Sequence, residues 1–360
     1  MLVPVIACIF NRCNEDQFTF IHLTYMLHEL NEIIENAREA QKRGLKSAFV
    51  SVVALNGSSY RRPGVRMLVR EDGKMVGAVS GGCVEKEVLK QAQSVFADGR
   101  PKLMMYDGRV RLGCEGILYI LIEPFMPEEG FFEAFYEQKK LRTPFSIDSY
   151  FSKEETHRFS GGSQFNFSNQ TSFKVSLFSE VDELEVFTQK VLEAFRLIIV
   201  GSEHDAVQLT KFAAAAGWEV TLVAPPDDPK SVSNFPGAST YLGIDEKAFG
   251  QLSFDPQTAV VLMAHSFVKD LKYLSALRDK KLTYIALLGP AKRRERLLNE
   301  LLDKYGDLSD VFLEAIHGPA GINIGAETAQ EIAISIMAEI LSVFRNEKPV
   351  SLKDKSGSIH

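Results

Sequence analysis

The first part of the chain alternates between helical and strand-like hydrophobic patterns. Apolar residues repeat at helical spacing over 27–43, where Leu27, Leu30, Ile34 and Ala37 share one face. The same reasoning predicts strands at 47–55, 66–70, 74–79, 103–106 and 117–122, and a helix at 85–97. Residues 27–125 are therefore predicted to form one mixed α/β domain, preceded by an N-terminal extension over 1–26.

Residues 126–194 have a different composition. Ser, Asn, Gln and Phe are abundant, and no long helical pattern begins before Val181. Short strands are predicted near 165–167 and 173–178. We interpret 126–194 as a connecting region that contains β strands.

From Phe195 onward, strand patterns alternate with helix patterns. Strands are predicted at 196–200, 218–223, 259–263 and 282–287, and helices at 204–216, 271–278, 291–305 and 327–344. This alternation is typical of a doubly wound parallel sheet with helices on both faces. Residues 195–347 are therefore predicted to form a Rossmann-like domain, and 348–360 a tail.

Composition narrows the functional classes. The chain of 360 residues is 45% apolar and 24% charged, with a net charge of −6. No apolar run approaches the roughly 18 residues of a spanning helix, and the negative charge argues against broad nucleic-acid binding. Four cysteines are too few for a disulfide scaffold. We expect a cytoplasmic protein that binds neither membranes nor nucleic acids and whose special cysteines are reactive or ligating.

An arginine cluster follows the first predicted strand. Arg61, Arg62 and Arg66 lie beside glycines and two serine hydroxyls in the segment 57–66. Guanidinium groups in this setting favour a cradle for an oxyanion or a phosphate. The alternative is a solvated basic turn, which composition alone favours.

A cysteine stands where a strand pattern gives way to a helix pattern. Gly81 and Gly82 precede Cys83. Glycines allow a ligand to approach the backbone, and the amides at a helix start attract anions. The same helix start lowers the pKa of a thiol. The alternative, a small buried cysteine, leaves the two glycines unexplained, so we favour a functional role.

A second loop cysteine, Cys114, lies in the glycine-containing segment 111–116. Together with Cys83 it would make a soft ligand pair. No CxxC or histidine spacing supports a structural zinc site.

The turn after the strand at 196–200 is where a dinucleotide fingerprint would lie. Gly201, His204 and Asp205 stand in this turn, but Glu203 occupies the position at which a glycine normally contacts a pyrophosphate. Ala224 replaces the acidic residue that normally binds the ribose. The pattern therefore indicates the fold but argues against NAD(P).

Two histidines complete the set of candidates. His265 follows a buried strand, at the edge where doubly wound sheets bind ligands, and His317 opens a glycine-rich loop. For both residues, ligand contact and a capping or core role remain equal alternatives.

Taken together, these segments resemble the XdhC/CoxI family of accessory factors for xanthine dehydrogenase and related molybdenum hydroxylases. The resemblance is carried by the order of GSSYRRPGVRMLV, SGGCVE, LGCEG, GSEHDA, AHSF, LLGPAKRRERLL and HGPAGINIGAETAQEIAISI. It implies a homo-oligomeric, non-catalytic maturation factor that binds the molybdenum cofactor, protects it during sulfuration and hands it to an apo-hydroxylase. A cysteine desulfurase is a further implied partner.

The resemblance also implies roles for individual residues. Cys83 would ligate molybdenum, the amides of Gly81 and Gly82 would take anionic or carbonyl oxygens, and the arginines would take the terminal phosphate. The further candidates for cofactor contact are Cys114, Gly201, His204, Asp205, His265 and His317. No residue is assigned a catalytic role.

Two functions of other classes remain open. One is an NAD(P)-dependent oxidoreductase, or an oxidoreductase-associated subunit, that uses the Rossmann-like half. The other is a thiol hydrolase with Cys83 as nucleophile and His265 as base. The chain shows no iron–sulfur cysteine pattern and is too short for a complete molybdenum hydroxylase.

Overall fold

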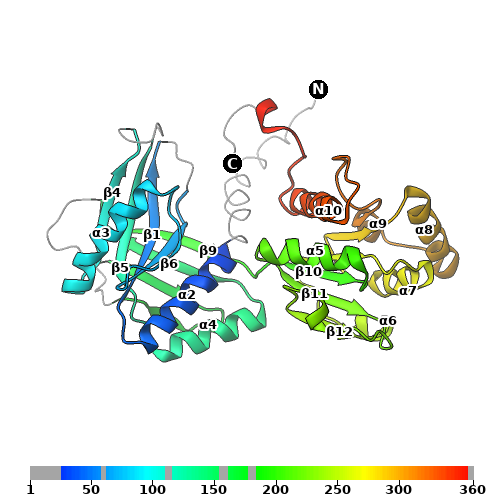
Figure 1. The fold of residues 1–360 in the computed structure, drawn as a ribbon, viewed down its shortest axis with the longest axis horizontal. Helices are drawn as coiled ribbons and strands as arrows, with labels where there is room; N and C mark the ends of the chain where they lie inside the picture. Colours follow the sequence, from blue (N-terminus) through cyan, green and yellow to red (C-terminus); the bar gives the residue numbers. More distant parts are fainter. Residues whose placement is uncertain (1–25, 58–61, 110–115, 154–160, 177–183, 356–360) are drawn as a thin grey trace, which may run out of the picture. The chain divides into compact units, whose positions relative to one another are not determined.

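The computed structural model describes residues 26–57, 62–109, 116–153, 161–176 and 184–355, except for the side chains of Met26 and Cys83. The chain folds into two compact units, Met1–Ala194 and Phe195–His360 (Figure 1). Among the described helices, none is both long enough and apolar enough to cross a membrane.

In the described part of the first unit, helix α2 (Met26–Lys42) precedes an antiparallel sheet of order β3-β2-β1-β5-β4. The strands are β1 (Ser47–Asn56), β2 (Arg66–Arg70), β3 (Met75–Gly77), β4 (Lys102–Asp107) and β5 (Ile117–Pro124). Helix α3 (Cys83–Asp98) packs on one face, where its Val84 and Val88 meet Val50 and Met67. Helix α2 covers the other face, so the central strands bury both of their sides.

A second antiparallel sheet follows, in the order β8-β7-β6-β9. Its strands are β6 (Phe145–Phe151), β7 (Gly162–Asn166), β8 (Ser172–Lys174) and β9 (Glu185–Val191). Helix α4 (Glu129–Leu141) precedes it. The absence of any long helix before Val181, expected from composition, is therefore wrong. The helix forms because its phenylalanine-rich face is buried: Phe131, Phe132 and Phe135 are all in the core.

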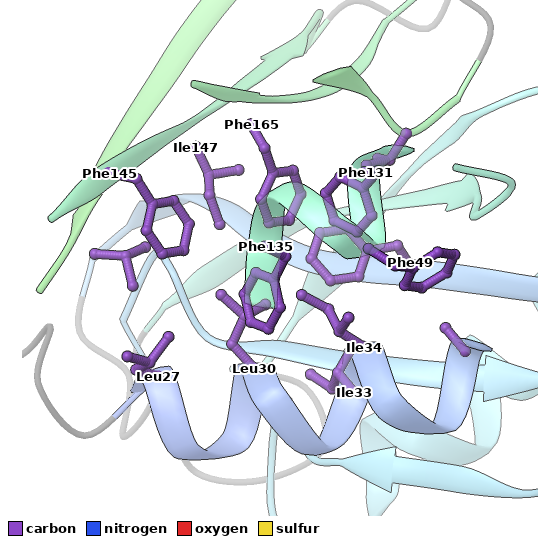
Figure 2. Close-up of a cluster of buried hydrophobic side chains, with 14 of the residues drawn as sticks. Leu27, Leu30, Ile33, Ile34, Phe49, Phe131, Phe135, Phe145, Ile147 and Phe165 are labelled. Carbon is purple, nitrogen blue, oxygen red and sulfur yellow. The ribbon is translucent and has the colours of Figure 1, made fainter. Parts of the chain in front are cut away.

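The largest core of this unit joins helices α2 and α4 to both sheets. Leu30 and Ile34 of α2 point toward Phe49 of β1 and Phe165 of β7 (Figure 2). The rings of Phe131 and Phe165 meet edge to face, with their centroids 5.0 Å apart. The region that the sequence assigned to a connector thus supplies half of a hydrophobic core.

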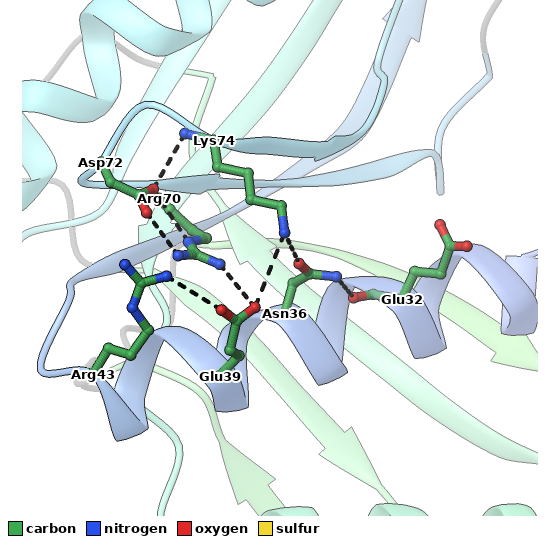
Figure 3. Close-up of polar contacts among 7 residues, drawn as sticks. All are labelled: Glu32, Asn36, Glu39, Arg43, Arg70, Asp72 and Lys74. Carbon is green, nitrogen blue, oxygen red and sulfur yellow. Dashed lines mark hydrogen bonds and ion pairs between the residues drawn. The ribbon is translucent and has the colours of Figure 1, made fainter.

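A polar network ties α2 to the hairpin formed by β2 and β3. The buried guanidinium of Arg70 pairs with Asp72 at 2.6 Å and with Glu39 of α2 at 3.1 Å (Figure 3). Lys74 adds a 2.7 Å hydrogen bond to Asn36. These contacts fix the hairpin against the helix, because a buried arginine needs partners for its donors.

The second unit is a parallel sheet of order β12-β11-β10-β13-β14-β15. Its strands are β10 (Arg196–Val200), β11 (Glu219–Ala224), β12 (Thr240–Gly243), β13 (Thr258–Leu262), β14 (Tyr284–Leu287) and β15 (Ile316–His317). Its longer helices are α5 (His204–Ala215), α7 (Phe267–Leu277), α8 (Ala291–Tyr305) and α10 (Ala329–Phe344). Short helices are α6 (Glu246–Phe249), α9 (Asp310–Glu314), η1 (Val232–Asn234) and η2 (Leu352–Asp354).

Each face of this sheet has its own core. Helices α5 and α10 bury Leu209 and Ile336 against one face, and helices α7 and α8 bury Leu274 and Leu297 against the other. The predicted fold is confirmed: a mixed α/β N-terminal part is followed by a Rossmann-like, doubly wound parallel sheet.

Candidate functional site

The topology of the first sheet brings together the flanks of three predicted motifs. Asn56 ends β1 opposite Ile117, which begins β5, and Asp107 ends β4 opposite the same residue. The beginning of β2, at Arg66, lies next to Gly77 at the end of β3. Because neighbouring strands are antiparallel, the connections 57–65, 78–82 and 108–116 all leave from one end of the sheet, which we call the loop end.

The loop end therefore carries the described flanks of all three motifs that the sequence singled out in this unit. Arg61 and Cys114 lie outside the described residues, so their prediction as contacts remains untested. Gly108 donates a 3.0 Å hydrogen bond to the carbonyl of Gly116, which closes the described flanks of the third connection.

Cys83 is the first residue of helix α3. Val79 before it and Val84 after it are buried, and these two anchors fix the exposed glycine turn between them. Gly82 has φ +119°, a conformation that L-residues with a Cβ rarely adopt. The glycine at 82 is therefore required by the turn itself.

The carboxylate of Glu85 closes this turn. It accepts hydrogen bonds from the amides of Ser80 and Gly82, at 2.6 and 2.7 Å, and from the Ser80 hydroxyl at 2.7 Å. Burial raises the pKa of Glu85, but these hydrogen bonds outweigh burial and hold the pKa below its usual value. The amide of Gly82, predicted to bind a ligand oxygen, is thus already engaged. Glu85 was not predicted as a site residue, although glutamate three residues after a helix cap is a known capping signal.

Arg66 is placed differently from its prediction. Its side chain is only 2% exposed, and it stacks over the ring of Phe49 on the face covered by α2. Helix α3 covers the opposite face. Burial lowers the pKa of Arg66 to about 9, although buried Glu123 opposes that shift. A side chain this buried fits neither a direct phosphate contact nor a solvated turn, so the prediction of Arg66 as a phosphate contact stays a prediction that this geometry does not favour. Arg62, by contrast, is half-buried in the turn before β2.

In the second unit, three predicted residues meet at the carboxyl ends of β10 and β13. Gly201 follows β10, and its amide donates to the carbonyl of Val223 at 2.9 Å. Nε2 of His265, after β13, lies 3.2 Å from a carboxylate oxygen of Asp205 in the first turn of α5. The chain turns in opposite directions from these two neighbouring strands, which is where doubly wound sheets bind ligands. His265 is 47% exposed and has φ +51°.

A buried carboxylate supports the turn that carries His265. Asp270 accepts a hydrogen bond from the amide of Ala264 at 3.1 Å and one from Arg293 at 2.6 Å. Burial raises the pKa of Asp270, and Arg293 opposes that shift. His204, which is exposed, is the first residue of α5 and directly precedes Asp205.

The turn after β10 is also held by residues that were not predicted from the sequence. The hydroxyl of Ser202 donates to Asp228 at 2.5 Å. The ammonium of Lys230 lies 2.6 Å from the carbonyl of Ser202 and 3.4 Å from the carboxylate of Glu203. The only sequence signal for these contacts was an acidic pair shortly after the end of β11. The acidic residue of a dinucleotide fingerprint was expected earlier, at the position of Ala224.

His317 belongs to a separate polar cluster. Its Nδ1 lies 3.4 Å from Glu339 of α10, and its ring stacks on Tyr284 with centroids 4.5 Å apart. Tyr284 donates to the same carboxylate at 2.5 Å, as does the amide of Gly321 at 2.8 Å. Burial raises the pKa of Tyr284 well above its usual value. These contacts tie the glycine-rich loop to α10, and the prediction of His317 as a cofactor contact stays a prediction.

No group of three or more metal-ligating side chains is found in the described ranges, whose gaps include Cys114 and the side chain of Cys83.

Comparison with known proteins supports the architecture. A family model described as the XdhC and CoxI family matches residues 40–107, and one described as the XdhC Rossmann domain matches residues 197–340. Together the two matches cover more than half of the chain.

Individual proteins match over nearly the full length. The chain is 27% identical to a protein of Bacillus subtilis (strain 168) that is named as a probable subunit of xanthine dehydrogenase, over 87% of this chain and 95% of that protein. It is 25% identical to the molybdenum cofactor insertion chaperone PaoD of Escherichia coli (strain K12), over 89% and 90% of the two chains. A crystal structure from Bacillus halodurans, described as a xanthine dehydrogenase, superposes with a TM-score of 0.71 and 26% identity, covering 88% of this chain and 96% of the other. The chain belongs to the XdhC and CoxI family.

Proposed function

We propose that this protein binds the molybdenum cofactor and delivers it to an apo-hydroxylase of the xanthine dehydrogenase type. The observation that carries the proposal is the loop end of the first sheet, where the flanks of the arginine, SGGC and LGCEG segments lie together. A relative of similar length is named a molybdenum cofactor insertion chaperone, which supports the same class of cargo.

We assign each part of the cofactor to the residues whose chemistry suits it. A cysteine thiolate suits molybdenum, so we assign Cys83 to the metal and Cys114 to a secondary contact. Guanidinium groups suit the terminal phosphate, so we assign Arg61 and Arg62 to it. The amide of Gly81 is the remaining backbone donor of the glycine turn in this assignment.

The second unit has a supporting part in this proposal. The pair of His265 and Asp205, together with Gly201 and His204, offers polar groups at the ligand edge of a doubly wound sheet. We propose that this edge contacts the cofactor and does not bind NAD(P), because Glu203 places a carboxylate in the phosphate turn and Ala224 stands where an acidic residue would bind the ribose. The oxidoreductase and hydrolase alternatives remain predictions.

The proposal extends to the cellular setting. We propose that the protein acts in the cytoplasm as a homo-oligomer and that it interacts with a cysteine desulfurase while the cofactor is bound. These properties belong to the proposed role in cofactor delivery.

The test uses the full chain and an apo-hydroxylase. Purified protein is mixed with molybdenum cofactor, separated from unbound material, and assayed for molybdenum and pterin. The loaded protein is then added to apo-enzyme and the recovered hydroxylase activity is measured. Co-retention of molybdenum and pterin followed by activation is the expected result, and no retention above an unrelated protein contradicts the proposal.

A further inference from the structure

Two buried side chains converge on one carbonyl at the base of the arginine segment. Nη1 of Arg66 donates to the carbonyl oxygen of Gly64 at 3.0 Å, and Nε2 of Gln189 donates to the same oxygen at 3.3 Å. Arg66 is 2% exposed and Gln189 is 3% exposed. Buried donors of this kind are held in place, because losing the acceptor would leave them unsatisfied.

The main chain at this point has little freedom. The amide of Gly64 donates to the carbonyl of Val52 at 2.8 Å, and the amide of Val52 donates to the carbonyl of Val65 at 2.9 Å. Gly64 has φ +100°, and a Cβ there would lie 2.5 Å from Nε2 of Gln189. The absence of a side chain at Gly64 is what lets Gln189 reach the carbonyl.

Gln189 comes from the second sheet of its unit. It lies in β9, where it pairs with Ile147 of β6, and it is outside the range 40–107 matched by the family model. A residue far along the chain therefore braces the turn that leads from Arg62 into β2.

We propose that Gln189 and Arg66 are positioning residues that clamp Gly64 and thereby hold Arg62 in the geometry that binds the anionic end of the cofactor. This inference rests on the proposed function, in which Arg62 contacts the terminal phosphate. It also gives Arg66 a role that fits its burial, since the residue orients the turn and does not touch the ligand.

The first measurement needs no ligand. Gln189→Met removes the donor at similar length, whereas Gln164→Met in β7 removes a hydrogen bond to Asn166 in the same sheet without touching Gly64. Amide exchange of segment 62–66 is expected to accelerate about tenfold in Gln189→Met and to stay at the wild-type rate in Gln164→Met. Unchanged exchange in Gln189→Met overturns the clamp. Gln189→Asn, which shortens the amide, replaces Gln189→Met if the latter does not fold.

The second measurement asks whether the clamp acts through Arg62. Binding of molybdenum cofactor is titrated for wild type, Gln189→Met, Arg62→Ala and the double variant, each at a temperature where it is fully folded. We expect Gln189→Met to weaken binding at least about fivefold, and the double variant to bind no more weakly than Arg62→Ala. A merely structural role would not give this non-additivity, so additive losses or wild-type affinity in Gln189→Met overturn the inference.

The two measurements separate the possible failures. If wild type binds no cofactor while Gln189→Met still accelerates exchange, the proposed function fails and the clamp has no binding role. If wild type binds cofactor and exchange is unchanged, the clamp alone fails.

Discussion

The carboxylate of Glu85 accepts a hydrogen bond from the amide of Gly82, with 2.7 Å between the oxygen and the nitrogen. The carboxylate of Glu85 is therefore an anion bound at the N-terminus of α3, next to Cys83. A carboxylate there offsets part of the positive end of the helix dipole. A ligand oxygen that used this amide would have to displace Glu85.

The hydrogen bonds to Glu85 predict a pH effect. The pKa of Glu85 is below its ordinary value of 4.5 in the folded protein, so its contribution to stability is present above that value and is lost as pH falls through the folded pKa. Glu85→Gln should lower the free energy of unfolding by about 1 kcal/mol at neutral pH, as expected for a lost cap, and by less in acid. Denaturant unfolding of both proteins from about pH 6 to about pH 3 checks this. A difference that is constant across the range would contradict it.

The backbone at Gly82 predicts a matched pair of variants. Gly82→Ala should destabilise the protein by about 1–3 kcal/mol, because φ +119° is strained for alanine even though a Cβ there meets no atom. A Cβ at Gly81 would also meet no atom, and Gly81 is not among the glycines with positive φ. Gly81→Ala should therefore lower the stability much less. Thermal unfolding of the two variants decides this, and equal costs would show that φ at Gly82 is not the reason for its glycine.

The contacts of Arg70 predict that its substitution lowers the stability of the fold and leaves cofactor retention unchanged. Arg70→Met should lower the free energy of unfolding by about 1–3 kcal/mol, because hydrogen bonds to Asp72 and Glu39 are lost. Lys74→Met, which removes an exposed partner from the same network, should cost less than about 1 kcal/mol. Cofactor retention should be unchanged in both folded variants. Loss of retention in folded Arg70→Met would assign this network a functional role.

The turn after β10 predicts weak binding of nicotinamide cofactors. Glu203 and Ala224 together should cost several kcal/mol, or about a thousandfold in affinity, relative to an intact fingerprint. Calorimetric titration with NAD+ and NADH should show no low-micromolar dissociation constant, and such a constant would favour the oxidoreductase alternative.

A double variant tests the reason for that weakness. Glu203→Gly combined with Ala224→Asp should improve NAD binding. No improvement would mean that other groups close the turn, and Lys230 and Asp228 are then the residues to change next because both contact Ser202.

The second unit was the part most open to prediction from sequence. Its central strands are apolar and its helices amphipathic, so the period of the pattern identifies both. The edge strands β12 and β15 were not predicted, because they are only four and two residues long and depend on pairing with neighbours.

Helix α4 and the placement of Arg66 are two features that were not predicted from the sequence. The phenylalanines at 131, 132 and 135 have helical spacing, but the polar composition around them suggested a loop. Arg66 was grouped with Arg61 and Arg62 by proximity in sequence. The period of two in β2 instead places it on the face of Leu68, under α2. The contacts of Asp228 and Gln189 arise from residues distant in sequence, and no local pattern encodes such contacts.

Retention of cofactor by Cys83→Ala tests the central claim most directly. Wild type, Cys83→Ala and the control Cys114→Ala are loaded with molybdenum cofactor and assayed for bound molybdenum and pterin, with thermal unfolding as the check on folding. The account predicts that Cys83→Ala folds but loses molybdenum retention, while Cys114→Ala loses less. Full retention by Cys83→Ala would contradict it.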